Sequence, residues 1–287
     1  MTRRVGLTAL AGSLVSACSF LSMFATLTPK DAARSPLSGV AYGQGPRQRL
    51  DVFAPPAASG AEPVAIFFYG GSWDSGRRAD YGWAGRALAA QGFLTMVPDY
   101  RLHPEVKFPD FLDDCALAVR WAVDQAAGLG GDPRRIVLIG HSAGAYNAAM
   151  LALDRRYLQA AGVDPAVVRA FAGLSGPYDF LPLDGPVTRR TFGQASDLAA
   201  TQPMAFVGPA APAAFLATGE ADTTVYPRNT RKLAAVLRQA GARVEEHHYA
   251  GLDHADTVLA LSRPFRGKTP LLSQMTTFLK SAAAATA

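Results

Sequence analysis

The chain has 287 residues, of which 49% are hydrophobic and 18% charged, proportions that are typical of a globular protein and exclude a disordered chain. Lys and Arg number 28 against 23 Asp and Glu, and the arginines are scattered rather than gathered into a basic stripe. We therefore expect no nucleic-acid partner. The two cysteines, Cys18 and Cys115, provide no disulfide framework, and Cys115 is expected to be a small buried residue.

The first 27 residues are typical of an export leader. Two arginines near the start precede an uncharged run over residues 5–29 that is rich in Leu, Ala and Ser. Residues 15–18 resemble a bacterial lipobox, in which Cys18 becomes lipidated, but residues 20–27 are more apolar than the usual tether. A lipoprotein, a cleaved signal and a retained anchor stay open. We expect an exported protein that is periplasmic or attached to the membrane through Cys18 or the apolar segment.

The rest of the chain predicts one domain over residues 40–287. Residues 28–39 lack periodicity and are predicted to be a linker. Residues 49–53 alternate polar and apolar side chains, which predicts a half-buried strand at an antiparallel edge. Apolar runs then alternate with amphipathic ones, which indicates an α/β fold with a mostly parallel, doubly wound sheet. Strands are predicted at 64–68, 94–97, 136–139, 170–174, 215–217 and 244–249, and helices at 81–91, 111–127, 143–153, 229–240 and 271–282.

One connection in this pattern is unusually long. Residues 176–212 separate two predicted strands, whereas a typical connection takes about 2–6 residues. The segment contains several prolines together with Phe180, Phe192 and Met204. It is predicted to be a short lid over the site, and a surface excursion without a catalytic role is the alternative.

A nucleophile elbow is the strongest motif. Residues 136–139 read Ile-Val-Leu-Ile, and the next five residues are Gly140, His141, Ser142, Ala143 and Gly144, followed by a helical run. The pattern G-x-S-x-G between a strand and a helix places a serine at the tip of a strained turn. The pattern alone is common by chance, but the strand and helix around it make it specific. Ser142 is therefore the predicted nucleophile.

A serine hydroxyl needs a base within hydrogen-bonding distance. Of the five histidines, His247 and His248 lie in a predicted strand, His141 adjoins the nucleophile, and His103 stands in a proline-flanked loop. His254 lies in the loop after the last strand, where its imidazole can reach the serine. His254 is the predicted base.

The base in turn needs a carboxylate that orients it, in the chain order serine, acid, histidine. The loop after the strand at 215–217 offers two, Glu220 and Asp222. Acyl transfer also requires N–H donors for the oxyanion. The predicted donors are the N–H of Ala143 in the elbow and the backbone at Gly70 and Gly71, where the strand at 64–68 runs into a glycine pair.

Together these motifs resemble the carboxylesterase and lipase branch of the α/β-hydrolase superfamily with an HGG-type oxyanion loop. This branch includes feruloyl and acetylxylan esterases, arylformamidases and hormone-sensitive-lipase-like enzymes. The resemblance covers about residues 40–279. It is carried by Tyr-Gly-Gly-Ser-Trp at 69–73, Asp-Tyr-Arg-Leu at 99–102, the elbow at 140–144, the loop at 219–225 and His254.

The resemblance implies roles for further residues. Its G-x-x-D-x-x-V pattern matches residues 219–225 and selects Asp222 as the acid, with Glu220 in reserve. Residues 99–102 are implied to brace the oxyanion loop. Tyr69 stands where the branch usually has His, so that a hydrogen-bonding Tyr would brace the loop and also narrow the acyl pocket. Trp73 and Tyr146 are candidate substrate-binding residues, and so is His103, although aromatic residues at a sheet edge are more often core.

The motifs predict a serine hydrolase that cleaves carboxylic esters through an acyl-enzyme. A small ester is the expected partner, and no metal or organic cofactor is expected. An arylformamidase or another amide hydrolase with the same triad is the nearest alternative. A catalytically silent binding protein is less favoured because all three triad residues are present. A prolyl-oligopeptidase-type peptidase is not expected, because such enzymes normally carry an additional large domain for which this sequence leaves no room.

Overall fold

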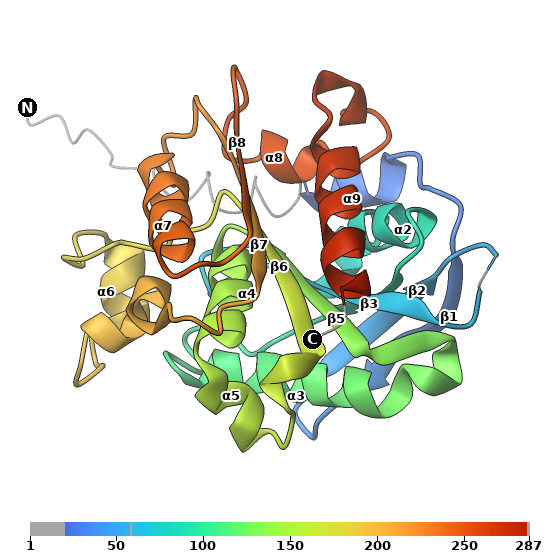
Figure 1. Cartoon of the computed structure of the whole chain (residues 1–287), viewed down its shortest axis with the longest axis horizontal. Coiled ribbons are helices and arrows are strands. Elements are labelled where there is room, and N and C mark those ends of the chain that lie inside the picture. Colours follow the sequence, from blue (N-terminus) through green and yellow to red (C-terminus); the bar gives the residue numbers. More distant parts are fainter. Residues whose placement is uncertain (1–20, 58, 286–287) are drawn as a thin grey trace, which may run out of the picture.

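The computed structural model describes residues 21–57 and 59–285, which form a sheet flanked by helices (Figure 1). Within these residues the sheet has eight strands in the order β1-β2-β4-β3-β5-β6-β7-β8. The pairs β1–β2 and β2–β4 are antiparallel, and every other pair is parallel. The strands are β1 (Arg34–Ala41), β2 (Arg49–Ala54), β3 (Glu62–Phe68), β4 (Leu94–Pro98), β5 (Gly131–His141), β6 (Val168–Leu174), β7 (Ala213–Gly219) and β8 (Val244–Tyr249). The predicted doubly wound α/β fold is confirmed.

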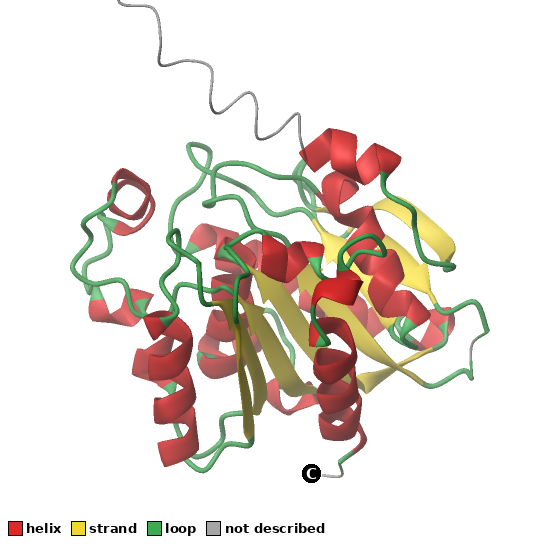
Figure 2. Ribbon diagram, turned by 90° about the horizontal axis from the view of Figure 1, so that it is seen from above, coloured by secondary structure: helices red, strands yellow, loops and turns green. Residues whose placement is uncertain are grey.

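Helices cover both faces of this sheet (Figure 2). α2 and α9 pack on one face, while α3, α4 and α7 pack on the other. The helices are α2 (Gly82–Ala90), α3 (Asp110–Gln125), α4 (Ala143–Leu153), α5 (Arg155–Ala160), α6 (Pro186–Phe192), α7 (Arg228–Gln239), α8 (Asp256–Leu259) and α9 (Leu271–Ala284). Each of the five longer predicted helices is present within a few residues of its predicted bounds.

The central strands are continuous apolar runs because helices bury them from both sides. All residues of β3 from Pro63 to Phe68 are buried, and so are residues 136–141 of β5. The six strands from β3 to β8 are parallel, so their carboxyl ends lie at one edge of the sheet. Loops that leave these ends therefore meet at one place, where ligands of open α/β sheets bind.

The first strand corrects two predictions. β1 occupies residues 34–41, so the second half of the predicted linker 28–39 belongs to the domain. Consequently β1, and not β2, is the antiparallel edge of the sheet. The sequence conceals β1 because it is mostly exposed, contains Pro36 and Gly39, and pairs with register shifts, so no alternation of apolar side chains marks it.

Part of the predicted leader is packed against the domain. Residues 21–27 are helical, and the ring of Phe24 meets the ring of Trp83 edge-on at 5.3 Å. Just after this helix, Asp31 forms a bidentate ion pair with Arg266. Residues 1–20, including Cys18, lie outside the described residues. None of the helices among residues 21–57 and 59–285 has the length and apolar character needed to cross a membrane.

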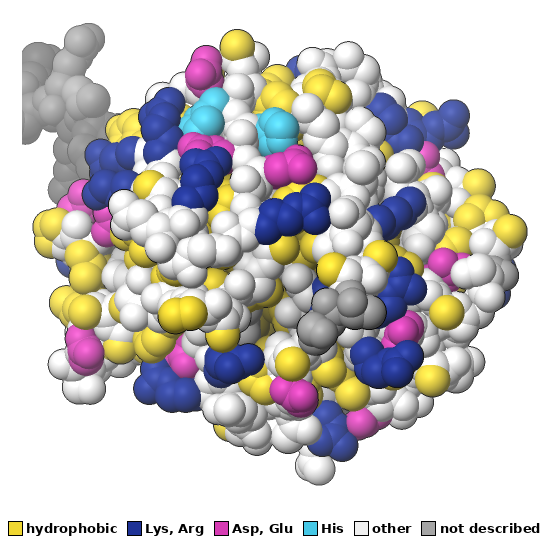
Figure 3. Space-filling model, in the orientation of Figure 1, with side chains coloured by type: hydrophobic (Ala, Val, Ile, Leu, Met, Phe, Trp, Pro, Cys, Tyr) yellow, Lys and Arg dark blue, Asp and Glu magenta, His cyan; other side chains and the backbone are white. Residues whose placement is uncertain are grey.

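On the face drawn in Figure 3, Lys and Arg side chains alternate with Asp and Glu and form no continuous basic stripe. Residues 176–212 form the predicted insertion, which contains α6 and projects beyond α7 in Figure 1.

Candidate active site

Ser142 occupies a sharp turn between β5 and α4. Its backbone has φ 54° and ψ −123°, a strained conformation for a residue with a side chain. The turn is possible because the neighbouring backbones approach closely. A Cβ added to Gly140 would lie 2.1 Å from the carbonyl oxygen of Gly144, and one added to Gly144 would lie 2.1 Å from that of Phe68. The predicted elbow is therefore present, with its serine at the carboxyl edge of the sheet.

The structure brings Ser142, His254 and Asp222 into one hydrogen-bonded chain. His254 Nε2 lies 2.9 Å from Ser142 Oγ, and His254 Nδ1 lies 2.8 Å from Asp222 Oδ2. Because a carboxylate only accepts, Nδ1 carries the proton and Nε2 presents its lone pair to the serine hydroxyl. The three residues follow β5, β7 and β8, far apart in sequence but adjacent at one sheet edge.

The carboxylate of Asp222 is held in place from both sides. Its Oδ1 accepts the N–H groups of Thr224 at 2.9 Å and Val225 at 2.8 Å. Burial favours the neutral acid, but the hydrogen bonds from His254 and the Val225 N–H outweigh burial and lower the pKa of Asp222. The reserve candidate, Glu220, is exposed, whereas the carboxylate that contacts His254 is that of Asp222. Asp222 is thus the carboxylate that orients the imidazole.

The loop after β3 borders the serine. A Cβ added to Gly70 would lie 3.0 Å from Ser142 Cβ, which places Gly70 directly against the elbow. Gly71 has φ 131°, and Ser72 and Trp73 follow in the left-handed region at φ 53° and 57°. The cavity beside Ser142 is lined by Ser72, Trp73 and Ala143, and not by the glycine pair itself. Trp73 thus lies at the cavity, as its prediction requires, and the assignment of Gly70, Gly71 and Ala143 as oxyanion donors stays a prediction.

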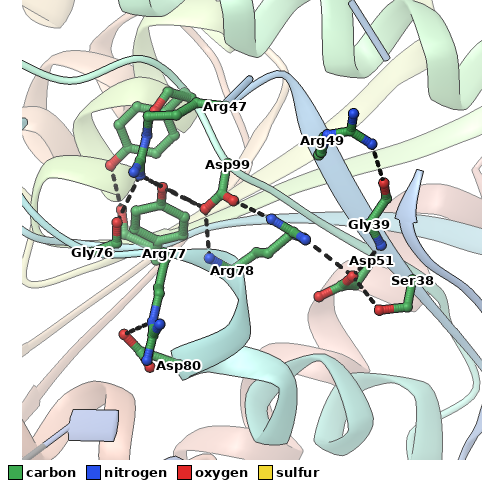
Figure 4. Close-up of polar contacts among 12 residues, drawn as sticks. Ser38, Gly39, Arg47, Arg49, Asp51, Gly76, Arg77, Arg78, Asp80 and Asp99 are labelled. Carbon is green, nitrogen blue, oxygen red and sulfur yellow. Dashed lines mark hydrogen bonds and ion pairs between the residues drawn. The ribbon is translucent and has the colours of Figure 1, made fainter. Parts of the chain in front are cut away.

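A buried polar cluster braces this loop at both ends (Figure 4). Near its start, the hydroxyl of Tyr69 donates to Asp99 at 2.9 Å and accepts from Arg47 at 2.8 Å. Near its end, Arg47 donates to the carbonyl of Gly76 at 2.7 Å, and both the N–H and the guanidinium of Arg78 donate to Asp99. Asp99 thus joins both ends of the loop, as the resemblance implied for residues 99–102.

Tyr69 takes the bracing position but does not narrow the pocket. Its ring is fully buried and stacks on Tyr100 at 4.8 Å and on Tyr81 at 5.4 Å. Burial, and then the charge of Asp99, raise the pKa of Tyr69 well above its ordinary value, so the hydroxyl stays protonated. Since the side chain points toward Asp99 and not into the cavity, the expected narrowing of the acyl pocket is wrong.

The cavity beside Ser142 has a volume of about 380 Å³, within the usual range for small-molecule sites. The insertion forms one side of it, as the predicted lid position requires, and the loop before α7 forms another. Its lining is Ser72, Trp73, Ser142, Ala143, Pro177, Asp179, Phe180, Leu181, Pro182, Asp184, Gly185, Val187, Thr188, Thr224, Val225, Tyr226, Arg228 and Asn229. A larger hollow of about 540 Å³ near α3 and α5 is not lined by Ser142, His254 or Asp222.

Two predicted pocket residues lie elsewhere. Tyr146 is fully buried within the core, where its hydroxyl donates to the carbonyl of Thr201 at 2.7 Å. Tyr146 does not line the cavity, although its ring packs against Trp73 and Phe180, which do. His103 does not line the cavity either. Its N–H donates to the carbonyl of Trp73 at 2.7 Å, so it supports the loop from behind.

Several cavity residues carry no motif in the sequence. Tyr226 lies just before α7 and Arg228 is the first residue of α7, and the guanidinium carbon of Arg228 lies 5.1 Å from the centre of the Tyr226 ring. Asn229 is buried, and its side-chain oxygen accepts the N–H groups of Tyr178 and Asp179, which anchors the start of the insertion. The one sequence signal for these residues is that they follow directly after residues 219–225, the loop that carries Asp222.

Comparisons with known proteins agree with this geometry. The BD-FAE family model matches residues 50–237. A protein of Oryza sativa subsp. japonica named as a probable isoprenylcysteine alpha-carbonyl methylesterase is 31% identical over 263 residues, which are 84% of this chain and 61% of that protein. Esterase LipQ of Mycobacterium tuberculosis is 30% identical over 257 residues, 80% of this chain and 59% of that protein. The chain thus spans about three fifths of the length of these relatives.

Solved structures show the same fold. Esterase B from Lactobacillus rhamnosis has a TM-score of 0.81 and 18% identity, and the match covers 94% of this chain and 93% of that one. A truncated carbohydrate esterase from gut microbiota has a TM-score of 0.78 and 20% identity, covering 90% of this chain and 99% of that one. Because the family model matches most of the domain, the chain belongs to the BD-FAE family.

Proposed function

We propose that this chain hydrolyses carboxylic esters with Ser142 as nucleophile. The observation that supports the proposal most strongly is the continuous contact from Ser142 through His254 to Asp222, with distances of 2.9 and 2.8 Å, together with the position of Ser142 in the lining of a cavity. A serine hydroxyl becomes nucleophilic when a neighbouring imidazole takes its proton. The named relatives, which include a carboxylesterase of Mycobacterium tuberculosis, are esterases.

The proposed reaction has two halves. Ser142 Oγ attacks the ester carbonyl while His254 Nε2 takes the hydroxyl proton, and the imidazolium then protonates the departing alcohol. The negative oxygen is held by main-chain N–H groups, for which Ala143 and residues 70–73 are the candidates. A water molecule deprotonated by His254 then attacks the acyl-enzyme and releases the acid. Asp222 stabilises the imidazolium throughout.

The cavity favours an ester with a short apolar part. Its volume of about 380 Å³ suits a small ligand, and many of its lining side chains are apolar, among them Trp73, Phe180, Leu181, Val187 and Val225. Hydrolysis of short p-nitrophenyl esters should therefore exceed hydrolysis of long ones. A methyl ester belongs in the same panel because the relative from Oryza sativa is named a methylesterase.

The test compares wild type with Ser142→Ala and His254→Ala on this panel. Both variants should lose about 10⁴-fold or more in kcat, because each removes an essential member of the same unit. A fluorophosphonate probe should label the wild type and not Ser142→Ala. Undiminished labelling of Ser142→Ala would contradict the assignment, absence of labelling in the wild type would indicate a binding protein, and preference for an aryl formamide at matched concentration would indicate an amide hydrolase.

A further inference from the structure

The main-chain carbonyl of His254 receives two buried side-chain donors. His141 Nε2 lies 2.9 Å from this oxygen, and the hydroxyl of Thr257 donates to it at 3.2 Å. The Thr257 hydroxyl is in turn 3.1 Å from the hydroxyl of Ser175. Two side chains therefore contact the main chain of the proposed base directly, and Ser175 reaches it through Thr257. None of the three was singled out as functional by the sequence.

All three side chains are buried. Thr257, Ser175 and His141 are 0%, 1% and 6% exposed. Burying a hydroxyl or an imidazole is unfavourable unless it is hydrogen-bonded. His141 and Thr257 find their partner in the His254 carbonyl, and Ser175 finds its partner in Thr257. Ser175 also takes the left-handed conformation with φ 50°, which is uncommon for a residue with a side chain and directs it into this cluster.

Ser175 supports the contact between Thr257 and the base. It follows β6, between the strands that lead to Ser142 and Asp222. Because the Thr257 hydroxyl donates its one proton to the His254 carbonyl, the Ser175 hydroxyl is the donor in its contact with Thr257. Ser175 thus reaches the His254 carbonyl through Thr257.

His141 can act only as a donor at this carbonyl. A carbonyl oxygen accepts, so Nε2 of His141 carries the proton, and Nδ1 has no partner among the described residues. Burial, and then the facing imidazole of His254, lower the pKa of His141 to about 3. The ring is therefore neutral, and its Nε2–H is available, wherever an esterase of this type works.

We propose that Ser175, Thr257 and His141 form a clamp on the main chain of His254 and serve as positioning residues for the reaction. The inference rests on the proposed function of Ser142 and His254. Fixing the His254 peptide fixes the starting point of its side chain, so that Nε2 and Nδ1 keep their distances to Ser142 and Asp222. A displacement of the order of 1 Å can cost about 10²-fold in rate.

The decisive comparison is Thr257→Val against Thr257→Ser in the full chain. Valine has the shape of threonine but no hydroxyl, whereas serine keeps the hydroxyl, so the pair separates hydrogen bonding from packing. Thr257→Val should lower kcat about 10- to 100-fold with KM changed less than about 3-fold, and Thr257→Ser should recover most of the loss. Ser175→Ala should lower kcat less, and the double variant should show less than additive losses because both act through one contact.

Proton NMR of the full chain gives a readout that does not depend on ester hydrolysis. The proton between His254 Nδ1 and Asp222 should give a downfield signal that is the same in Thr257→Ser as in the wild type and that broadens in Thr257→Val and Ser175→Ala. An unchanged kcat or an unchanged signal in Thr257→Val would overturn the clamp. Failure of Ser142→Ala to lose activity would instead overturn the proposed function, while the NMR comparison would still decide the clamp.

Discussion

On one side of the cavity, residues 69–78 are held by the buried side chain of Asp99. The ring of Tyr69, at the start of this segment, stacks on the rings of Tyr81 and Tyr100. On the other side, the insertion of residues 176–212 consists of short helical turns and loops, with Leu181 37% exposed. We call these two sides the braced wall and the insertion. They touch through the partly exposed ion pair of Arg190 with Asp74.

The difference follows the work that each side is proposed to do. The braced wall carries the main chain next to Ser142, where small displacements affect charge stabilisation in the transition state. The insertion mainly supplies surface to the substrate, and its length is free to vary without breaking the sheet. The buried hydrogen bonds of the braced wall thus lie beside the proposed nucleophile, whereas the short turns and loops of the insertion lie where the substrate is proposed to bind.

The largest expected effect that tests this contrast comes from Asp99→Ala. The substitution leaves Arg78 and the Tyr69 hydroxyl without their acceptor at a site that is only 4% exposed. We expect the free energy of unfolding to fall by about 3 kcal/mol, measured by urea denaturation, and kcat to fall because both ends of the loop are released.

A matched control for Asp99→Ala removes an ion pair from the surface. Arg120 and Asp124 are an i,i+4 pair on α3 with both side chains more than 40% exposed. Arg120→Ala should leave the urea midpoint and kcat unchanged, because exposed pairs of this kind contribute little. Equal losses in the two variants would remove the distinction between the braced wall and the ordinary surface.

A pH dependence gives the next largest effect. The pKa of buried His141 is lowered to about 3, whereas the unfolded chain has the ordinary value of 6.5. The contribution of neutral His141 to stability is therefore complete above pH 6.5 and is lost as the pH falls toward 3. The slope should be about 1.4 kcal/mol per pH unit in that window.

Urea denaturation at pH 7, 6 and 5 of wild type and His141→Gln measures this slope. His141→Gln should show a smaller loss of stability on acidification, even if its stability at pH 7 is already lower. The insertion contains no histidine, so variants within it should keep the wild-type slope. Parallel curves for wild type and His141→Gln would show that the imidazole is not buried as described.

The smallest effect is expected in the insertion. Val187 lines the cavity and is only half-buried. Val187→Ala should raise KM for an apolar ester about 3-fold, because part of an apolar contact is lost, with kcat and the melting temperature nearly unchanged. Val207→Ala, in the same insertion but away from the cavity, is the control. A large fall in kcat in Val187→Ala would place the insertion in the same class as the braced wall.

Local patterns account for the fold and for part of the site. Continuous apolar runs predicted the buried strands, and the sequence around Ser142 predicted a turn whose glycines prove to be needed by contacts of 2.1 Å. Such features depend on neighbours in the chain, so the sequence displays them directly. β1 escaped prediction because its residues are held by backbone pairing to β2 and not by apolar burial.

By itself the sequence determined the α/β alternation, the elbow at Ser142 and the order in which acid and base follow it. The resemblance already favoured Asp222 over Glu220, and the structure shows that Asp222 contacts His254. Only the tertiary structure turned Tyr146 into the core, brought Tyr226 and Arg228 to the cavity and gathered His141, Ser175 and Thr257 at His254. The reason is physical. Strand and turn preferences act over a few residues, whereas contacts between loops arise from the register of parallel strands whose carboxyl ends meet at one edge.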